Sequence, residues 1–294
     1  MPYFSVVTPS WNQGPHIETC IRCILDQRDP DFEHIIIDNC STDATPQILA
    51  KYPHLKLIVE KDRGQSDAIN KGFRAASGEI ICWLNSDDAY PEGTFQKLRE
   101  AFADPSVDVV FGDVLQVAYD GTADQRSPAS FARREDLVRW WSSDARLHQP
   151  AVFFRRSVVE AIGLLREDLH LVMDYEYWWR MSEKFRFHYL PEILAIQHRQ
   201  LDSKTMQNWN GVYREREKVF APHYSLLGLS PVEIKRTRRL AMAERYLTEA
   251  YCVTGNQPRE IARAFWRSLR QSPAYALHPR SFGLFRRLVL GGRC

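Results

Sequence analysis

The chain has 294 residues, of which 44% are hydrophobic and 26% are charged, and its formal net charge is +2. This composition excludes disordered and fibrous chains and suits an enzyme with one large domain and a helical appendage. No apolar run approaches the length of a membrane span, and residues 1–4 lead straight into a core strand, so we expect neither a spanning helix nor a secretory signal. The six cysteines form no disulfide framework, so we expect reduced thiols and a cytoplasmic protein.

Short apolar runs alternate with helical patterns over the first 114 residues. The first run, residues 4–8, predicts a strand that Pro9 breaks. Further strands are predicted at residues 34–39, 55–60, 79–84 and 107–114, with helices at 17–27, 44–51 and 66–76. Such alternation is typical of a mostly parallel sheet covered by helices.

Polar residues follow several of these strands. Ligands of open α/β sheets bind beyond the carboxyl ends of the strands, where the sequence brings together Thr8, Ser10, Asp38, Asp62 and the pair Asp87 and Asp88. Adjacent carboxylates repel each other unless a cation or strong donors compensate them, and hard oxygen ligands suit Mg²⁺ or Mn²⁺. Taken alone, the pair is explained equally well by an ordinary turn. The loop after the first strand lacks a glycine-rich phosphate motif, so metal would have to neutralise a bound diphosphate.

Four ordered segments, residues 5–12, 35–43, 60–72 and 78–88, resemble the nucleotide-sugar-dependent glycosyltransferases of family 2, whose fold is called GT-A. The resemblance continues through residues 148–150 and 173–180 and fades beyond residue 205. It implies an α/β fold, a Rossmann-like mixed and mostly parallel sheet with flanking helices. We therefore expect a GT-A catalytic domain over residues 1–205 and a basic helical region over residues 206–294.

The resemblance also implies positions for the nucleotide and its metal. The nucleotide-binding residues would be Thr8, Pro9, Ser10, Asn12, Asp38, Asp62, Gln65, Asp67, Asn70 and Asp87. Asp88, together with Asp87, would ligate Mn²⁺ or Mg²⁺. Two of these residues have plainer explanations, because Asp38 suits a turn before a helix and Asp67 suits the positive end of a helix macrodipole.

The attacking side of glycosyl transfer needs a base, because a hydroxyl is a poor nucleophile at neutral pH. By resemblance, Asp174 occupies that place, and Glu176 is the substitute if Asp174 serves only as a helix cap. The departing diphosphate needs no proton donor when a cation stabilises its charge.

Contacts to the donor sugar or the acceptor are expected from Asp113, His148, Gln149 and Trp178. Asp113 and His148 can equally be hydrogen-bonded structural residues. Of the three aromatic residues Tyr177, Trp178 and Trp179, two are expected in the core and one can offer a stacking face to a sugar ring.

One position departs from the family pattern. Many relatives have a histidine that completes the metal shell where this chain has Leu201, which cannot bind a cation. Either His198 or Asp202 substitutes, water fills the position, or the metal is bound more loosely. Arg199 or Lys204 can contact the pyrophosphate.

The last third of the chain is basic. From residue 206 onward there are sixteen Lys and Arg against six acidic residues, a balance of +10, which leaves −8 for the first 205 residues. Helices are predicted at residues 231–251, with Ser230 as cap, and at 259–270, where Arg259, Arg263, Arg267 and Arg270 share one face. This stripe, like the Arg-rich apolar residues 281–290, suits peripheral contact with the inner face of the plasma membrane, or equally a solvated helical face. Nucleic acid is not expected, because no reading motif accompanies the charge.

The sequence therefore predicts an inverting, metal-assisted glycosyltransferase of cell-envelope polysaccharide biosynthesis. It would move a sugar from a nucleotide-sugar, expected to be UDP-linked, to a hydroxyl of a glycan or lipid-linked acceptor. The alternative is a non-catalytic carbohydrate-binding or scaffold protein derived from such an enzyme, an alternative that Leu201 keeps open.

Overall fold

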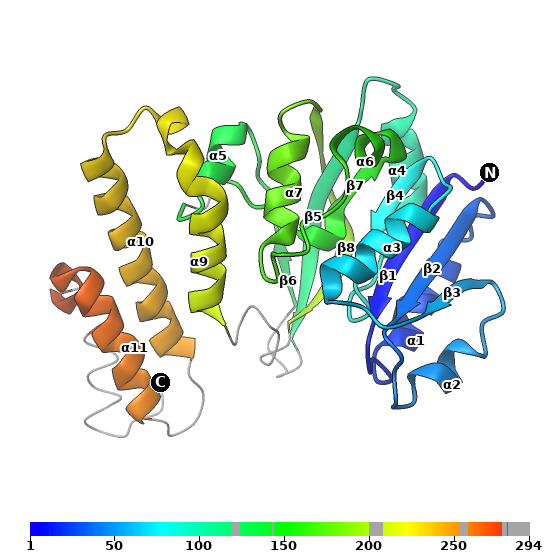
Figure 1. Cartoon of the computed structure of the whole chain (residues 1–294), viewed down its shortest axis with the longest axis horizontal. Coiled ribbons are helices and arrows are strands. Elements are labelled where there is room, and N and C mark those ends of the chain that lie inside the picture. Colours follow the sequence, from blue (N-terminus) through cyan, green and yellow to red (C-terminus); the bar gives the residue numbers. More distant parts are fainter. Residues whose placement is uncertain (119–123, 143, 200–207, 253–257, 278–280, 282–294) are drawn as a thin grey trace. The chain divides into compact units, whose positions relative to one another are not determined.

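The structure is a computed structural model that describes residues 1–118, 124–142, 144–199, 208–252, 258–277 and 281. The chain divides into two compact units (Figure 1). The first comprises Met1–Leu137 and Asp144–Ala221, and the second comprises Val138–Ser143 and Pro222–Cys294. The domain boundary predicted from the sequence, after residue 205, falls outside the described residues.

The first unit is built on an eight-stranded sheet with the order β3-β2-β1-β4-β7-β5-β6, in which β8 also pairs with β5. The strands are β1 (Phe4–Ser10), β2 (Phe32–Asp38), β3 (Leu55–Val59), β4 (Ile80–Trp83), β5 (Val109–Ala118), β6 (Gln125–Ser127), β7 (Val152–Arg155) and β8 (Phe187–Arg199). β1 runs parallel to β2 and β4, as β2 does to β3 and β5 to β8. β7 is antiparallel to β4 and β5, and β6 to β5. The predicted α/β fold with a mixed, mostly parallel sheet is confirmed.

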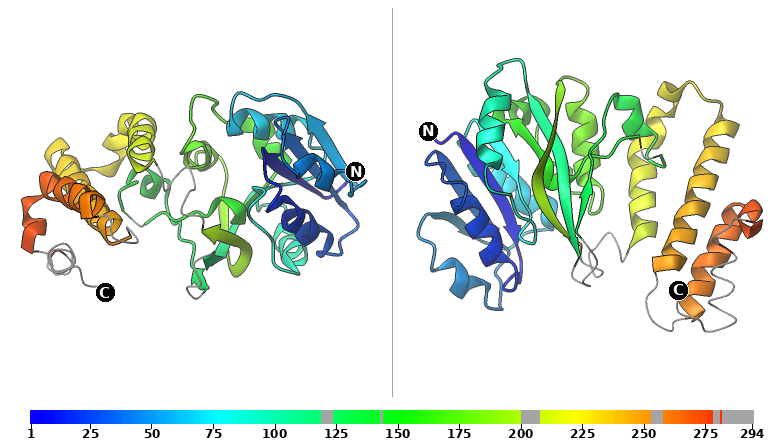
Figure 2. Two further views of the ribbon diagram at one scale, coloured as in Figure 1. Left: turned by 90° about the horizontal axis from the view of Figure 1, so that it is seen from below. Right: turned by 180° about the vertical axis from the view of Figure 1, so that it is seen from behind.

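Helices cover both faces of this sheet (Figures 1 and 2). The helices of the first unit are α1 (Ile17–Leu25), α2 (Thr45–Leu49), α3 (Gln65–Ala75), α4 (Thr94–Phe102), α5 (Arg134–Val138), α6 (Arg156–Ile162), α7 (Met173–Met181) and α9 (Trp209–Phe220), of which α5 and α9 lie away from the sheet. The amphipathic pattern explains α1, because its buried residues Ile17, Cys20, Ile21 and Ile24 recur at helical spacing. Cys20 and Ile24 join a core cluster with Phe4 and Val6 of β1, so α1 packs on the sheet face that these strand residues line.

α3 packs closely on the opposite face of the sheet. A Cβ atom added at Gly72 would lie 2.2 Å from Val7 Cγ1 and 2.7 Å from Ile37 Cδ1, which is too close for any side chain. Glycine at this position therefore lets α3 approach β1 and β2. The approach places the first turn of α3 beside the carboxyl ends of those strands.

β1 continues through Pro9 to Ser10, so the prediction that Pro9 breaks the strand is wrong. Alternate residues of a strand face opposite neighbours, and the bond from Leu84 N–H to Val7 O shows that the odd-numbered residues of β1 face β4. The ladder with β4 ends at Val7, so Pro9 lies beyond it, where the strand needs no N–H donor.

The second unit contains α10 (Pro231–Cys252), α11 (Pro258–Gln271) and the 3₁₀ turns η2 (Ala221–Leu227, which begins at the unit boundary) and η3 (Pro273–Leu277). Ser230 caps α10, as predicted, and Glu233 completes a reciprocal capping box with bonds of 2.8 and 3.3 Å. α10 and α11 bury Leu247 and Ala250 against Ile261 and Ala264. No helix in the described ranges is both long and apolar enough to cross a membrane.

Arg267 does not share the exposed face of α11 that the sequence predicts for it. Its guanidinium lies over the ring of Tyr246 at 5.9 Å from the centroid and is half-buried. Arg259, Arg263 and Arg270 are exposed, and with Trp266, which is 61% exposed, they recur at helical spacing along one face. We call these four residues the α11 basic face.

Candidate functional site

The carboxyl ends of β1, β2 and β4 meet at one edge of the sheet because these strands are parallel. Ser10 and Asp38 are register partners at this edge, and both are buried. Asp38 accepts hydrogen bonds from Ser41 N at 2.8 Å and Ser41 Oγ at 2.6 Å, so it closes the turn after β2. Within the described part of the chain, Ser10 Oγ has no hydrogen-bond partner. A buried orphan hydroxyl is costly, so Ser10 is a donor available to a ligand at this edge.

Two other residues expected near the nucleotide are tied into the protein itself. Thr8 is fully buried, and its Oγ1 lies 3.0 Å from His34 Nε2. Asn12 has a φ of 52° and joins the loops after β1 and β2. Its backbone N–H donates to Ser41 Oγ, and its side-chain Oδ1 accepts from Thr42 N. Thr8 thus contacts the neighbouring strand β2 near the end of β1, whereas Asn12 shapes the loop that follows β1.

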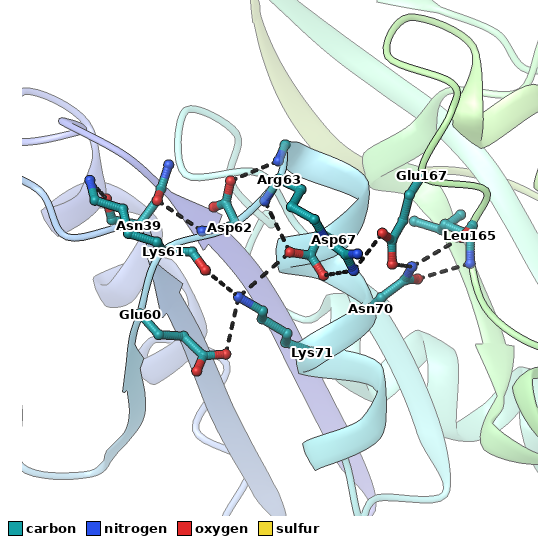
Figure 3. A network of polar contacts seen from close by, with 11 residues as sticks. Asn39, Glu60, Lys61, Asp62, Arg63, Asp67, Asn70, Lys71, Leu165 and Glu167 are labelled. Carbon is teal, nitrogen blue, oxygen red and sulfur yellow. Dashed lines mark hydrogen bonds and ion pairs between the residues drawn. The ribbon is translucent and has the colours of Figure 1, made fainter.

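The segment between β3 and α3 forms a polar network (Figure 3). The Asp62 carboxylate accepts from Gly64 N at 2.9 Å, and the Asp62 amide donates to Asn39 Oδ1 at 3.0 Å. Burial opposes ionisation of Asp67, but hydrogen bonds from Arg63 hold its pKa below the usual range. Lys71 Nζ lies 3.6 Å from the same carboxylate. Asp67 is therefore part of an ion-pair network in the first turn of α3, which agrees with its plainer explanation from the sequence.

Asn70 and Gln65 of α3 reach towards different neighbours. Asn70 exchanges two hydrogen bonds with the backbone of Leu165, at 2.9 and 3.0 Å, and so fastens α3 to the segment before α7. Gln65 Nε2 donates to Asn85 Oδ1 at 3.1 Å, which directs it to the turn after β4. Of these two, Gln65 lies next to the strand ends and Asn70 holds the scaffold.

The turn after β4 presents Asp87 and Asp88. Asp88 is 5% exposed, and both burial and the Asp87 charge raise its pKa well above the usual range. Burial likewise raises the pKa of Asp87. Across the residues that the structure describes, neither carboxylate forms an ion pair with Lys or Arg. Asp87 is only half-buried, and the charges of His16 and His198 partly offset the rise of its pKa, whereas Asp88 is buried beside a like charge, an arrangement that a bound cation would stabilise.

These two carboxylates fit a divalent cation. Among the described residues no third His, Cys, Asp or Glu side chain converges with them into a metal cluster. Mg²⁺ commonly takes only one or two protein carboxylates and fills its shell with water and substrate phosphates, so the donor set suits a cation shared with a substrate. His198 Nδ1 lies 2.6 Å from the backbone oxygen of Asp87, so its ring lies beside the pair, and its role as a metal ligand stays a prediction. Leu201, Asp202 and Lys204 lie outside the described residues.

Asn85 is a site residue that sequence reasoning missed. Its Oδ1 accepts from Gln65 and from Trp83 Nε1, both at 3.1 Å, and its Nδ2 donates to Gln149 Oε1 at 2.8 Å. Gln149 in turn donates to Trp83 O at 2.6 Å. Asn85 therefore connects α3, β4 and the 3₁₀ turn η1 (Gln149–Ala151) beside the two aspartates. The sequence signal for it is its place in the run Asn85-Ser86-Asp87-Asp88, of which only the two carboxylates enter the prediction.

His148 and Asp113 differ in what they leave available. Burial and Arg146 lower the pKa of His148 to about 4, so the imidazole is neutral, and no described group hydrogen-bonds its buried Nε2. Asp113 accepts from Arg126 Nε at 2.7 Å, Ala129 N at 2.8 Å and Tyr189 OH at 2.8 Å. Asp113 is thus occupied by structural partners, whereas His148 retains an unpaired ring nitrogen.

The two acidic candidates for the base both lie on α7, but they differ in their partners. Asp174 lies in the first turn, is partly exposed, and accepts a hydrogen bond from Tyr175 N at 2.8 Å; burial raises its pKa. Glu176 is 5% exposed, and Arg180 binds both of its oxygens, at 2.8 and 3.0 Å. A bidentate ion pair argues against Glu176 as a base and leaves Asp174 as the available carboxylate.

Trp178 does not offer a stacking face, contrary to the sequence-based expectation. Its side chain is fully buried and packs near Trp83 and Phe154. Tyr177 and Trp179 are buried as well. α7 lies between the sheet and neighbouring helices, so all three aromatic side chains contribute to the core.

Comparison with known proteins identifies the chain's relatives. The sequence model of the family described as glycosyl transferase family 2 matches residues 5–163. A putative teichuronic acid biosynthesis glycosyltransferase, TuaG of Bacillus subtilis, is 35% identical over 126 residues, which are 41% of this chain and 50% of that protein. A PGL/p-HBAD biosynthesis glycosyltransferase of Mycobacterium tuberculosis is 30% identical over 60% of this chain and 68% of its own length. The chain thus spans half of the first relative.

Solved structures share the fold at low sequence identity. TarS 1–349 of S. aureus in complex with UDP matches with a TM-score of 0.59 and 18% identity, covering 98% of this chain and 90% of that one. The mannosyltransferase PcManGT of Pyrobaculum calidifontis, in complex with GDP-Man and Mn²⁺, matches with a TM-score of 0.55 and 19% identity, covering 99% and 80%. With more than half of its residues matched by the family model and a GT-A-like fold, the chain belongs to glycosyl transferase family 2.

Proposed function

We propose that this protein transfers a sugar from a nucleotide-sugar, UDP-linked, to a hydroxyl of a glycan or lipid-linked acceptor, with inversion at the anomeric carbon. The observation that carries the proposal is the pair of adjacent carboxylates at the carboxyl edge of the parallel strands, namely half-buried Asp87 and buried Asp88, with no described Lys or Arg paired to either. Support comes from structural neighbours that bind UDP, UDP-GlcNAc, or GDP-Man with Mn²⁺. The relatives' roles in teichuronic acid and PGL biosynthesis support a cell-envelope acceptor.

The donor side of the site would bind a divalent cation and the negatively charged diphosphate of the donor. Asp87 and Asp88 would hold Mn²⁺ or Mg²⁺ between the protein and the diphosphate. Such a cation supplies positive charge that stabilises the departing diphosphate. The protein itself contributes Ser10, with its unpaired hydroxyl, and Asn85, which holds Gln65 and Gln149 beside the aspartates.

Asp174 takes the proton of the acceptor hydroxyl. Burial raises the pKa of Asp174, which makes its carboxylate a stronger base. Because one base and one displacement suffice, the bond to the acceptor forms on the face opposite the departing diphosphate. The product therefore has the inverted configuration.

Titration calorimetry with UDP tests the donor site. We expect UDP to bind in the presence of Mn²⁺ and its affinity to fall about tenfold or more when EDTA removes the metal, because the diphosphate loses its counter-charge. The control is uridine, whose binding should not depend on Mn²⁺ because it has no phosphate. A scaffold protein derived from a glycosyltransferase would give no metal-dependent UDP binding, and that result would reject the proposal.

We also propose that the second unit contacts anionic lipid through the α11 basic face. Its three arginines have no ion-pair partner among the described residues, and Trp266 exposes a large apolar ring between them. Arginine attracts lipid phosphates, and Trp favours the boundary between headgroups and acyl chains. A lipid-linked acceptor would be presented at such a surface.

Vesicle sedimentation measures this contact. Replacing Arg259, Arg263 and Arg270 together with Gln should weaken binding to phosphatidylglycerol-containing vesicles roughly 100-fold, from about 1 kcal/mol for each basic residue. A matched control with the same loss of charge changes three exposed residues outside α11 to Gln, namely Arg214, Lys235 and Arg236. Equal binding by the two triple variants, or equal binding of the wild type to neutral phosphatidylcholine vesicles, would refute the assignment.

A further inference from the structure

The segment between α6 and α7, residues 163–172, leads directly to Asp174 and is held from two sides. On one side, α3 fastens it through Asn70, bonded to Leu165, and through Ser66 Oγ, which donates to Leu169 O at 3.1 Å. On the other side lies α9, which is outside the residues matched by the family model. The position of Asp174 therefore depends on contacts that α9 makes.

Glu215 of α9 binds three consecutive backbone amides of this segment. Its carboxylate accepts from Leu171 N at 2.8 Å, from Val172 N at 3.2 Å and from His170 N at 3.1 Å. Val172 is the N-cap of α7 and makes no side-chain cap bond. The helix itself has no acceptor for the N–H groups of these three residues, and Glu215 supplies one. The negative charge of Glu215 also lies at the positive end of the α7 macrodipole.

Arg216, the next residue, contacts the first turn of α7. Its guanidinium lies over the ring of Tyr175 at 4.6 Å from the centroid. Lys218, two residues further, donates to Asp168 at 2.6 Å, which is an exposed bond. α9 thus presents alternating charges to the segment before α7 and to the first turn of α7.

We propose that Glu215 is a positioning residue that fixes the backbone ahead of Asp174, and that Arg216 is the cation that faces the Asp174 carboxylate. α9 thereby completes the acceptor side of the site. The proposal rests on the proposed role of Asp174 as the base. A base must meet the acceptor hydroxyl at hydrogen-bond distance, so a loosened segment before α7 would slow transfer without affecting the nucleotide.

The two α9 residues affect the charge of Asp174 in opposite directions. The groups that face this carboxylate are Tyr175 on its own helix and Arg216 and Glu215 from α9. Burial is the largest influence and raises the pKa of Asp174, Arg216 lowers it, and Glu215 raises it. Removing the Glu215 charge should therefore lower the pKa of Asp174, and removing the Arg216 charge should raise it. Opposite shifts would show that both charges lie close to the Asp174 carboxylate.

Two measurements on the full chain test the proposal without any substrate. The first is amide hydrogen exchange of residues 170–172, which we expect to become about tenfold faster in Glu215→Gln and faster still in Glu215→Ala. The second is the titration of the Asp174 carboxyl by ¹³C NMR, assigned through Asp174→Asn, with the pKa falling in Glu215→Gln and rising in Arg216→Gln. Matched controls on the same helix are Glu217→Gln for the lost carboxylate, since Glu217 makes none of these amide bonds, and Arg214→Gln for the lost guanidinium.

The outcomes separate this inference from the proposed function. Unchanged exchange at residues 170–172 in both Glu215 variants, or pKa shifts of the same sign in Glu215→Gln and Arg216→Gln, would overturn the role of α9. Where a donor supports turnover, Glu215→Gln should lower kcat about tenfold and leave the affinity for UDP unchanged. Wild-type turnover in Asp174→Asn would instead refute the proposed base, whatever the exchange data show.

Discussion

Replacing Asp88 with Asn is expected to lower Mn²⁺-dependent turnover by two orders of magnitude or more, roughly 3 kcal/mol of transition-state stabilisation. Asparagine keeps the size of the side chain but loses the charge that would hold the cation at the diphosphate. The same change removes the repulsion between the buried Asp88 carboxylate and its neighbour Asp87, so the metal-free variant should unfold at a temperature at least as high as the wild type. Steady-state kinetics and a thermal melt on one preparation measure both effects.

The control for this variant is Asp26→Asn, which removes one exposed carboxylate at the end of α1. It should leave both turnover and its dependence on Mn²⁺ unchanged. Wild-type-like turnover in Asp88→Asn would show that the pair does not hold the cation. A large fall in melting temperature would show instead that Asp88 serves the fold, and the loss of activity would then say nothing about metal.

Replacing Asp174 with Asn is expected to lower kcat by about 10²–10⁴-fold, which is the usual contribution of a general base. Asparagine cannot accept the proton, but it can still accept the hydrogen bond from Tyr175 N, so α7 should keep its start. The affinity for UDP should not change, because the nucleotide-binding candidates lie on the strand ends and α3. The measurement combines kcat with calorimetric UDP binding.

Glu176→Gln is the informative comparison for Asp174→Asn. It breaks the buried ion pair with Arg180, so we expect a loss of stability and near-normal turnover by the protein that remains folded. If turnover instead survives in Asp174→Asn and is lost in Glu176→Gln at equal folded fraction, the base assignment is reversed.

Pattern and motif predicted much of the architecture. The helix at α1 and the buried strands β2 and β4 follow from periodicity and apolar runs, which depend only on neighbours in the sequence. The Ser230 cap of α10 is equally local. Asp87 and Asp88 could be singled out because the strand that precedes them and the adjacency of their charges are both visible in the sequence.

Predictions that depended on burial or on distant partners were less successful. Pro9 remains in a strand because the neighbouring strand ends before reaching it, which no local rule can show. Trp178 is a core residue because α7 lies against the sheet, and Arg267 turns inward onto Tyr246 because α10 and α11 pair. Asn85 was missed because two of its three partners, Gln65 and Gln149, lie 20 and 64 residues away in the sequence.

The sequence by itself determined the family, the strands that carry the polar edge, and the two adjacent aspartates at that edge, because these depend on short segments whose chemistry is read locally. Only the tertiary structure decided which carboxylates remain available. Glu176 and Asp113 are occupied by arginines, whereas buried Asp88 and half-buried Asp87 and Asp174 form no ion pair with Lys or Arg among the described residues. The physical reason is that ionisation of a carboxylate depends on its surroundings in space, and those surroundings come from elements far apart in the chain.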